Sequence, residues 1–121
     1  MEVYDQAHAL ARSLRNSDAF RRLLQAEAAL VKEPSNWTKL QDVRQKQMQI
    51  TAQQMAGEQV DQKRIDALNN MMQALLMNSQ IRDYLQAEER FAQLLADVQK
   101  IIGEVVQELK ILTDNKGKEG V

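Results

Sequence analysis

Apolar residues recur every three or four positions along most of this chain, which is the spacing of one face of an α-helix. The repeat is most regular towards the carboxyl end, where it alternates steps of four and three over four heptads. The seam positions are Tyr84, Glu88, Phe91, Leu95, Val98, Ile102, Val105, Leu109 and Leu112. The pattern therefore predicts one long helix over residues 79–112, about 50 Å in length at ~1.5 Å per residue.

A helix of this length is longer than the domain that the chain can form. A compact domain of 121 residues has a radius of gyration near ~14 Å, so the long helix must overhang. A second apolar stripe of Leu94, Ile101 and Val106 widens its face. Either the earlier helices fold back along the overhang, or another chain covers it.

Two shorter helices are predicted at the amino end. The first covers residues 3–14, and Ser17 then offers its hydroxyl as the N-cap of a second helix. This second helix must end near residue 33, because Pro34 disfavours the helical conformation in the residue before it.

Two further helices fill the middle of the chain. Ser35 or Asn36 is expected to cap a third helix over residues 37–56, with Gly57 closing it in a left-handed turn. Its apolar stripe is thin, and glutamines make its other face polar. Asp61 is expected to cap a fourth helix, which breaks at residues 78–79 before the long one.

The composition agrees with this pattern. The chain has only four glycines, one proline and 4% aromatic residues, which leaves few turn residues for a β protein. We expect an all-α fold, a helical bundle of about five helices with a long C-terminal helix. Residues 1–112 would form one helical domain, and residues 113–121, polar and glycine-bearing, are expected to be a disordered tail.

Several kinds of chemistry lack the residues they need. The chain contains no cysteine and one histidine, His8, so thiolate nucleophiles, disulfides and the usual zinc and iron–sulfur sites are not expected. Carboxylate pairs such as Glu104 and Glu108 occur without the Glu-x-x-His elements of a di-iron bundle. We expect no catalytic, metal or cofactor-binding residues, no cofactor and no enzyme activity.

The remaining composition favours protein contacts in the cytoplasm. Lys and Arg total 16 against 17 for Asp and Glu, a net charge of -1, which argues against a dedicated nucleic-acid binder. No apolar run is long enough to span a bilayer, and no signal peptide is readable. We expect a cytoplasmic homo-oligomer, a dimer being favoured, without membrane partners and with other proteins as further candidate partners.

The expected self-association surface lies on the long helix. Its anchors are the apolar seam residues Phe91, Leu95, Val98, Ile102 and Val105. The glutamine-rich third helix would add a polar face for a partner. A bare coiled coil is a weaker alternative, because the first four helices have apolar faces of their own.

A small basic cluster around the junction of the first two helices supports a rival hypothesis. Its members are Arg12, Arg15, Arg21 and Arg22. They could contact RNA or an acidic partner. Asp18, however, stands three and four residues before two of them, the spacing of ordinary helical ion pairs, and no aromatic stacking platform accompanies the cluster.

Two features allow alternative interpretations. Glu88 occupies a seam position, where it either fixes the helix register as a buried polar residue or lies where the seam opens to solvent. Five methionines either fill the core, which is the commoner use, or form an adaptable partner groove: Met48, Met55, Met71, Met72 and Met77.

Short motifs spread along residues 3–112 also resemble a known family. They are Val3-Tyr4-Asp5, Ala9-Leu10, Leu14, Ser17-Asp18-Ala19-Phe20, Val43-Arg44, Gln53-Gln54-Met55-Ala56-Gly57-Glu58, Tyr84-Leu85-Gln86-Ala87-Glu88-Glu89-Arg90, Leu94-Leu95 and Ile101-Ile102. In order and spacing they resemble the YheA/YmcA/YlbF family of small helical bacterial proteins, most closely its YheA-like branch.

The resemblance implies a cytoplasmic, self-associating helical bundle that works through protein contacts. Better-known relatives regulate competence, sporulation and biofilm development. They act in a complex that affects RNA processing by a membrane-anchored endoribonuclease, and part of that complex carries iron–sulfur clusters ligated by cysteine. This chain departs from that pattern, because it has no cysteine to supply such ligands. The family pattern offers no catalytic residues to transfer.

Overall fold

The computed structural model describes residues 2–109 and shows five helices there. They are α1 (Glu2–Arg15), α2 (Asp18–Val31), α3 (Pro34–Met55), α4 (Gln62–Leu75) and α5 (Ser79–Gln107). The predicted all-α fold with a long last helix is confirmed. This last helix, α5, ends at Gln107, before the expected end at residue 112. Leu112 and the tail predicted over residues 113–121 lie outside the described residues.

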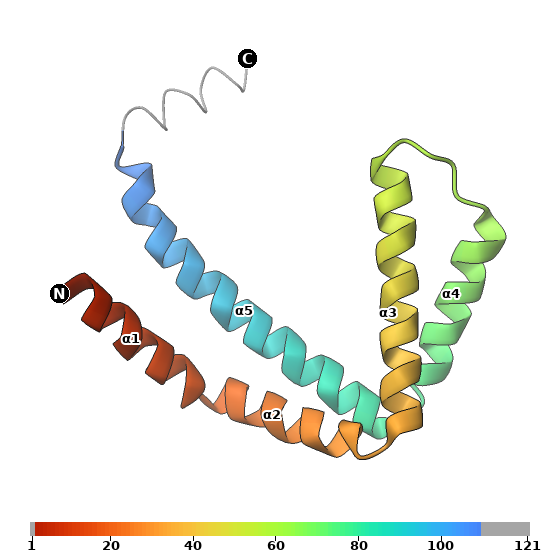
Figure 1. The fold of residues 1–121 in the computed structure, drawn as a ribbon, viewed down its shortest axis with the longest axis horizontal. Helices are drawn as coiled ribbons and strands as arrows, with labels where there is room; N and C mark the ends of the chain where they lie inside the picture. Colours follow the sequence, from red (N-terminus) through yellow and green to blue (C-terminus); the bar gives the residue numbers. More distant parts are fainter. Residues whose placement is uncertain (1, 110–121) are drawn as a thin grey trace.

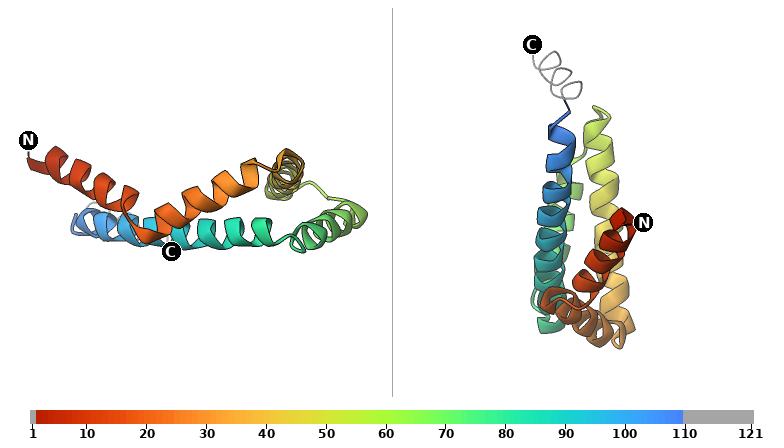
Figure 2. Two further views of the ribbon diagram at one scale, coloured as in Figure 1. Left: turned by 90° about the horizontal axis from the view of Figure 1, so that it is seen from below. Right: turned by 90° about the vertical axis from the view of Figure 1, so that its left-hand side faces the viewer.

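The helices form a V with two arms (Figure 1). In one arm α2 packs along the first half of α5, and α1 continues from α2 at an angle. The other arm is the antiparallel hairpin of α3 and α4. Seen from below and from the side, the molecule stays thin, without further layers over either arm (Figure 2). The four helix ends of α2, α3, α4 and α5 meet at the vertex.

Side chains at the predicted breaks set the helix starts. The Ser17 hydroxyl accepts a hydrogen bond from the Phe20 amide at 3.2 Å and donates one to the Leu14 carbonyl at 2.6 Å. Asp61 and Asn78 accept from backbone amides at 3.0 and 3.1 Å and so cap α4 and α5. Each of these side-chain oxygens accepts from an amide that the helix leaves without a partner. The caps predicted at Ser17 and Asp61 are confirmed.

The start of α3 differs from the prediction. We expected Ser35 or Asn36 as the cap, but the helix already begins at Pro34, and Glu33 precedes it without a side-chain cap. Proline suits the first helical position, because its fixed φ is already helical and its missing amide hydrogen has no role there. At the other end, Gly57 adopts φ +80° as predicted, a conformation that favours glycine.

The core is small and centred on the vertex. Eight apolar residues are buried among the described ones: Leu30, Leu40, Val43, Ile50, Leu68, Leu75, Ile81 and Tyr84. They come from α2, α3, α4 and α5, and none comes from α1. The vertex therefore holds the two arms together, while the far end of each arm contributes little to the core.

The open shape leaves apolar surface exposed. Each helix has an apolar stripe that is stable only when another element covers it. Thirteen large apolar side chains are exposed among the described residues, so the two arms leave part of these stripes uncovered.

Candidate functional site

The structure explains why Glu88 stands in the apolar seam. Its carboxylate accepts two hydrogen bonds from the Arg44 guanidinium of α3, at 3.0 and 2.5 Å. The two side chains are 28% and 38% exposed, so the pair lies at the edge of the core. A two-point pair of this kind fixes direction as well as distance. Glu88 therefore joins α5 to α3 and sets the register of the two arms.

Two aromatic rings extend this contact into the core. The Arg44 guanidinium lies 5.5 Å from the centre of the Tyr84 ring, within cation–π range. Trp37 meets the same ring edge-on, at 5.7 Å and 76°. Arg44, Glu88, Tyr84 and Trp37, here called the vertex cluster, thus combine charge pairing with ring packing. This cluster serves to hold the V in shape.

The cluster also changes the acidity of its members. Burial raises the pKa of the Tyr84 hydroxyl, and the neighbouring Glu88 charge raises it further, although Arg44 opposes this rise. Burial acts to lower the pKa of the Arg44 guanidinium, but its hydrogen bond and charge interaction with Glu88 outweigh burial, so that this pKa is raised. Arg44 accordingly remains charged throughout the range in which Tyr84 titrates.

The raised Tyr84 pKa predicts a loss of stability in alkaline solution. Below the unfolded-state tyrosine pKa of about 10 the stabilising contribution is fully present, and it is lost as the pH rises through the higher folded-state pKa. We expect the urea midpoint to fall more steeply above about pH 10 for the native chain than for Tyr84→Phe. Other alkaline groups are common to both proteins, so parallel curves would refute the prediction.

The predicted self-association seam is divided into two parts by the fold. Phe91 packs against Phe20 of α2, with ring centres 5.3 Å apart, and Leu95 and Val98 are half-buried. The chain's own α2 therefore covers Phe91 in the first part of the seam. Beyond Val98 the seam lies open, with Ile102 55% exposed and Val105 65% exposed.

One arm of the V ends in α1 and the second half of α5 (Figure 1), and both helices carry exposed apolar side chains there. We call α1 together with residues 98–109, which are the last part of α5 and the two residues after it, the free end. Its exposed large apolar residues are Val3, Tyr4, Ile101, Ile102, Val105, Val106 and Leu109. Single exposed apolar residues are common on protein surfaces, but the five from Ile101 to Leu109 recur within about two and a half helical turns, and such sets mark interaction sites.

The predicted basic cluster has ordinary structural partners. Arg12 and Arg15 stand in the last turn of α1, where the helix dipole favours positive charge. Arg22 pairs with Asp18 at 2.8 Å. All four arginines, including Arg21, are exposed, and only Arg22 lines the groove between α2 and α5.

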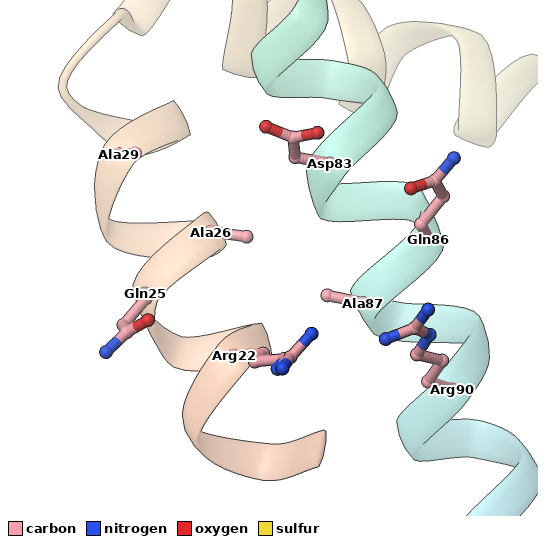
Figure 3. A pocket seen from close by; sticks show the side chains of 8 residues that line it. All are labelled: Arg22, Gln25, Ala26, Ala29, Asp83, Gln86, Ala87 and Arg90. Carbon is pink, nitrogen blue, oxygen red and sulfur yellow. The ribbon is translucent and has the colours of Figure 1, made fainter. Parts of the chain in front are cut away.

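That groove has a volume of about 430 Å³ and a narrow, alanine-rich floor. Arg22 and Arg90 point into it from opposite helices, and Ala26 and Ala87 lie between the helices (Figure 3). Asp83 stands towards the other end of the groove. Arg90 was not among the predicted site residues, because only the packing of α2 against α5 brings it opposite Arg22.

A second groove runs along one face of the α3–α4 hairpin. Two adjoining hollows of about 260 and 190 Å³ share Met71. The apolar floor consists of Val43, Ile50, Ala67, Leu68, Met71, Ala74 and Leu75. Lys39, Lys46 and Arg64 stand along the rim with Asp42 and Gln49. We call this the hairpin groove.

The sequence did not identify the hairpin groove as a site. The spacing of seven residues between Lys39 and Lys46 places both on one helix face, but nothing in the sequence pairs that face with Arg64. The methionines were the other sequence feature that could have indicated a partner groove. Core filling, the commoner interpretation, is wrong for Met48, Met55 and Met77, which are 72–84% exposed, whereas half-buried Met72 packs on the core.

Two further kinds of site are absent from residues 2–109. No group of three or more His, Cys, Asp or Glu side chains stands close enough to hold a metal ion there. In the same part of the chain, no helix combines the length and apolar character needed to cross a membrane.

Comparisons with known proteins agree with this architecture. A solved Bacillus stearothermophilus protein, described as DUF964, superposes with a TM-score of 0.75 at 21% identity, covering 90% of this chain and 96% of that one. It supports the fold alone. A UPF0342 protein of Symbiobacterium thermophilum is 36% identical over 86% of this chain and 93% of its own length. A UPF0342 protein of Clostridium tetani is 32% identical over 88% and 91%.

The family comparison covers nearly all of the described chain. The model described as "Control of competence regulator ComK, YlbF/YmcA" matches residues 3–107. This span includes all the motifs on which the resemblance was based. The description of the family names a regulatory role. The chain therefore belongs to the YlbF/YmcA family.

Proposed function

We propose that this protein is a non-catalytic regulator that acts by self-association and by contacts with other proteins, with the free end of α5 as its main contact surface. The observation that carries the proposal is the set of exposed apolar side chains beyond Val98. The regulatory description of the family supports the same role. The vertex cluster supports it indirectly, since it holds the surfaces of both arms in fixed positions.

The energetics favour association of this surface. Burying a Val, Leu or Ile side chain completely is worth about 1.5–3 kcal/mol, so a side chain that is half exposed retains roughly 1 kcal/mol to gain. The five such side chains beyond Val98 offset a substantial part of the association cost of ~4–15 kcal/mol.

If the free end associates, a single charge introduced there should strongly weaken the association. We expect sedimentation equilibrium to show a dimer or larger species for the native chain, and Ile102→Glu to weaken association about 100-fold or more, because the carboxylate would be buried without a partner. Ile102 is 55% exposed in the monomer, so the variant should keep its helical circular dichroism.

Met55→Glu is the matched control. Met55 is 84% exposed at the far end of the α3–α4 hairpin, so the same chemical change there should leave association unaltered. A native chain that stays monomeric over the whole concentration series would refute the proposal. Equal association of Ile102→Glu and the native chain would also refute it.

A further inference from the structure

The hairpin groove lacks the third helix that such a surface needs. Two helices packed side by side bury only the seam between them, and a stable helical core usually has another element over that seam. Here Leu68 and Leu75 form part of the floor, and Met71 in its centre is 37% exposed. The groove spans residues 39–50 of α3, roughly 17 Å at 1.5 Å per residue.

The rim of the groove is basic. Lys39, Lys46 and Arg64 carry three positive charges, against one negative charge on Asp42. Asp42 pairs with Lys46 at 3.1 Å. The side chains of Lys39 and Lys46 are both exposed, so either ammonium group is accessible to a carboxylate. An apolar floor with such a rim suits an amphipathic helix bearing acidic residues.

The second half of α5 is a helix of this chemistry. Ile101, Glu104, Val105 and Glu108 follow the i, i+3, i+4, i+7 spacing of one helix face, and Asp97 stands one turn before them. All five are exposed. Among the described residues no cation is paired with these carboxylates, and Asp97 accepts only a hydrogen bond from Gln93, at 2.9 Å.

The lengths and charge spacings of the two surfaces also match. Residues 97–108 of α5 span roughly 17 Å, the same as the groove. Asp97 and Glu104 are seven residues apart, as are Lys39 and Lys46. Within one molecule α5 belongs to the other arm of the V (Figure 1), so its free half is available to a different copy.

We propose that the occupant of the hairpin groove is a second copy of this chain, which lays the acidic face of its α5 (residues 97–108) between Lys39, Lys46 and Arg64. The inference rests on the proposed self-association and names the surface that receives the free end. If the exchange is reciprocal, both acidic faces are covered in a closed, two-fold dimer. The interface then buries Ile101 and Val105 on Met71 and the hairpin floor.

Charge exchange tests this arrangement. The groove variant Lys39→Glu/Lys46→Glu and the helix variant Asp97→Lys/Glu104→Lys each bring like charges together, so each should associate at least about tenfold more weakly in sedimentation equilibrium. The variant with all four exchanges has the native net charge and again places opposite charges on the two surfaces at the exchanged positions, although the Asp42–Lys46 pair within α3 stays broken. We expect it to associate as tightly as the native chain, yet not to form mixed dimers with it.

The controls separate specific pairing from general repulsion. Lys32→Glu/Lys63→Glu makes the same net-charge change as the groove variant at exposed lysines that do not line the groove, and it should associate like the native chain at 0.15 M salt. Circular dichroism checks that each variant folds. If a double variant does not fold, the single changes Lys46→Glu and Glu104→Lys, and both together, give the same comparison.

The outcomes also separate this inference from the proposed function. If the groove and helix variants associate like the native chain while Ile102→Glu dissociates, the free end associates but docks elsewhere, and the inference is wrong. If both double variants dissociate and the fourfold exchange does not recover, the charges do not meet each other, which also overturns it. A monomeric native chain would remove the proposed function together with the inference.

Discussion

Leu40→Ala should lower the free energy of unfolding by about 3–4 kcal/mol, within the range of ~2–5 kcal/mol found for truncation of buried leucines. Leu40 is 0% exposed and belongs to the core where the helices of both arms meet. The cavity would lie at the vertex, and few other buried residues share the task of holding the arms together. Since domains of this size are stable by only ~5–15 kcal/mol, the variant should have a markedly lower melting temperature.

Leu24→Ala provides the matched comparison, because it removes the same atoms from a leucine of α2 that is 49% exposed. Its cost should be about 1 kcal/mol, in proportion to the smaller area returned to water. Urea unfolding at one fixed protein concentration measures both, since association contributes to stability. Similar losses for the two variants would contradict a core centred on the vertex.

Glu88→Ala should cost about 2 kcal/mol, more than an exposed ion pair contributes. It leaves the Arg44 guanidinium half-buried against Tyr84 without its carboxylate. Both side chains keep some contact with water, so the loss should be smaller than the ~3–5 kcal/mol seen for fully buried pairs. Chemical denaturation of the variant and the native chain gives the difference directly.

Two further variants identify the cause of this loss of stability. Asp42→Ala breaks the Asp42–Lys46 pair, whose side chains are 49% and 48% exposed, and should cost only about 0.5 kcal/mol. The double variant Arg44→Met/Glu88→Leu removes both charges together and should recover part of the loss. If Glu88→Ala matched Asp42→Ala, the vertex cluster would have no special part in joining the arms.

The sequence was most informative about local structure. A hydroxyl or carboxylate at Ser17 or Asp61 satisfies amides within its own helix turn, so that these starts depend on nearby residues only. Gly57 closes α3 for an equally local reason, a positive φ. The wrong prediction for the start of α3 has a local cause as well. Pro34 disfavours a helical conformation in the residue before it, but Pro34 itself favours the first helical turn.

The candidate sites were less predictable, because they depend on how helices pack. Seam spacing selected Phe91 and Ile102 alike, yet α2 covers the first and leaves the second exposed. No spacing rule separates them, since both lie on the same apolar stripe. The pairing of Arg44 with Glu88 joins residues 44 positions apart, and Arg64 reaches the groove rim beside Lys46 only because α3 and α4 form a hairpin.

The sequence by itself determined five helices, their approximate limits and an all-α protein without cysteine chemistry, since helix periodicity and capping act over only a few residues. The tertiary structure decided that the helices open into a V, that Glu88 meets a cation, and that several apolar side chains in the second half of α5 stay exposed within the part of the chain that the structure describes. Those outcomes depend on packing between distant segments, where many arrangements satisfy the same local pattern and only the sum of contacts selects one.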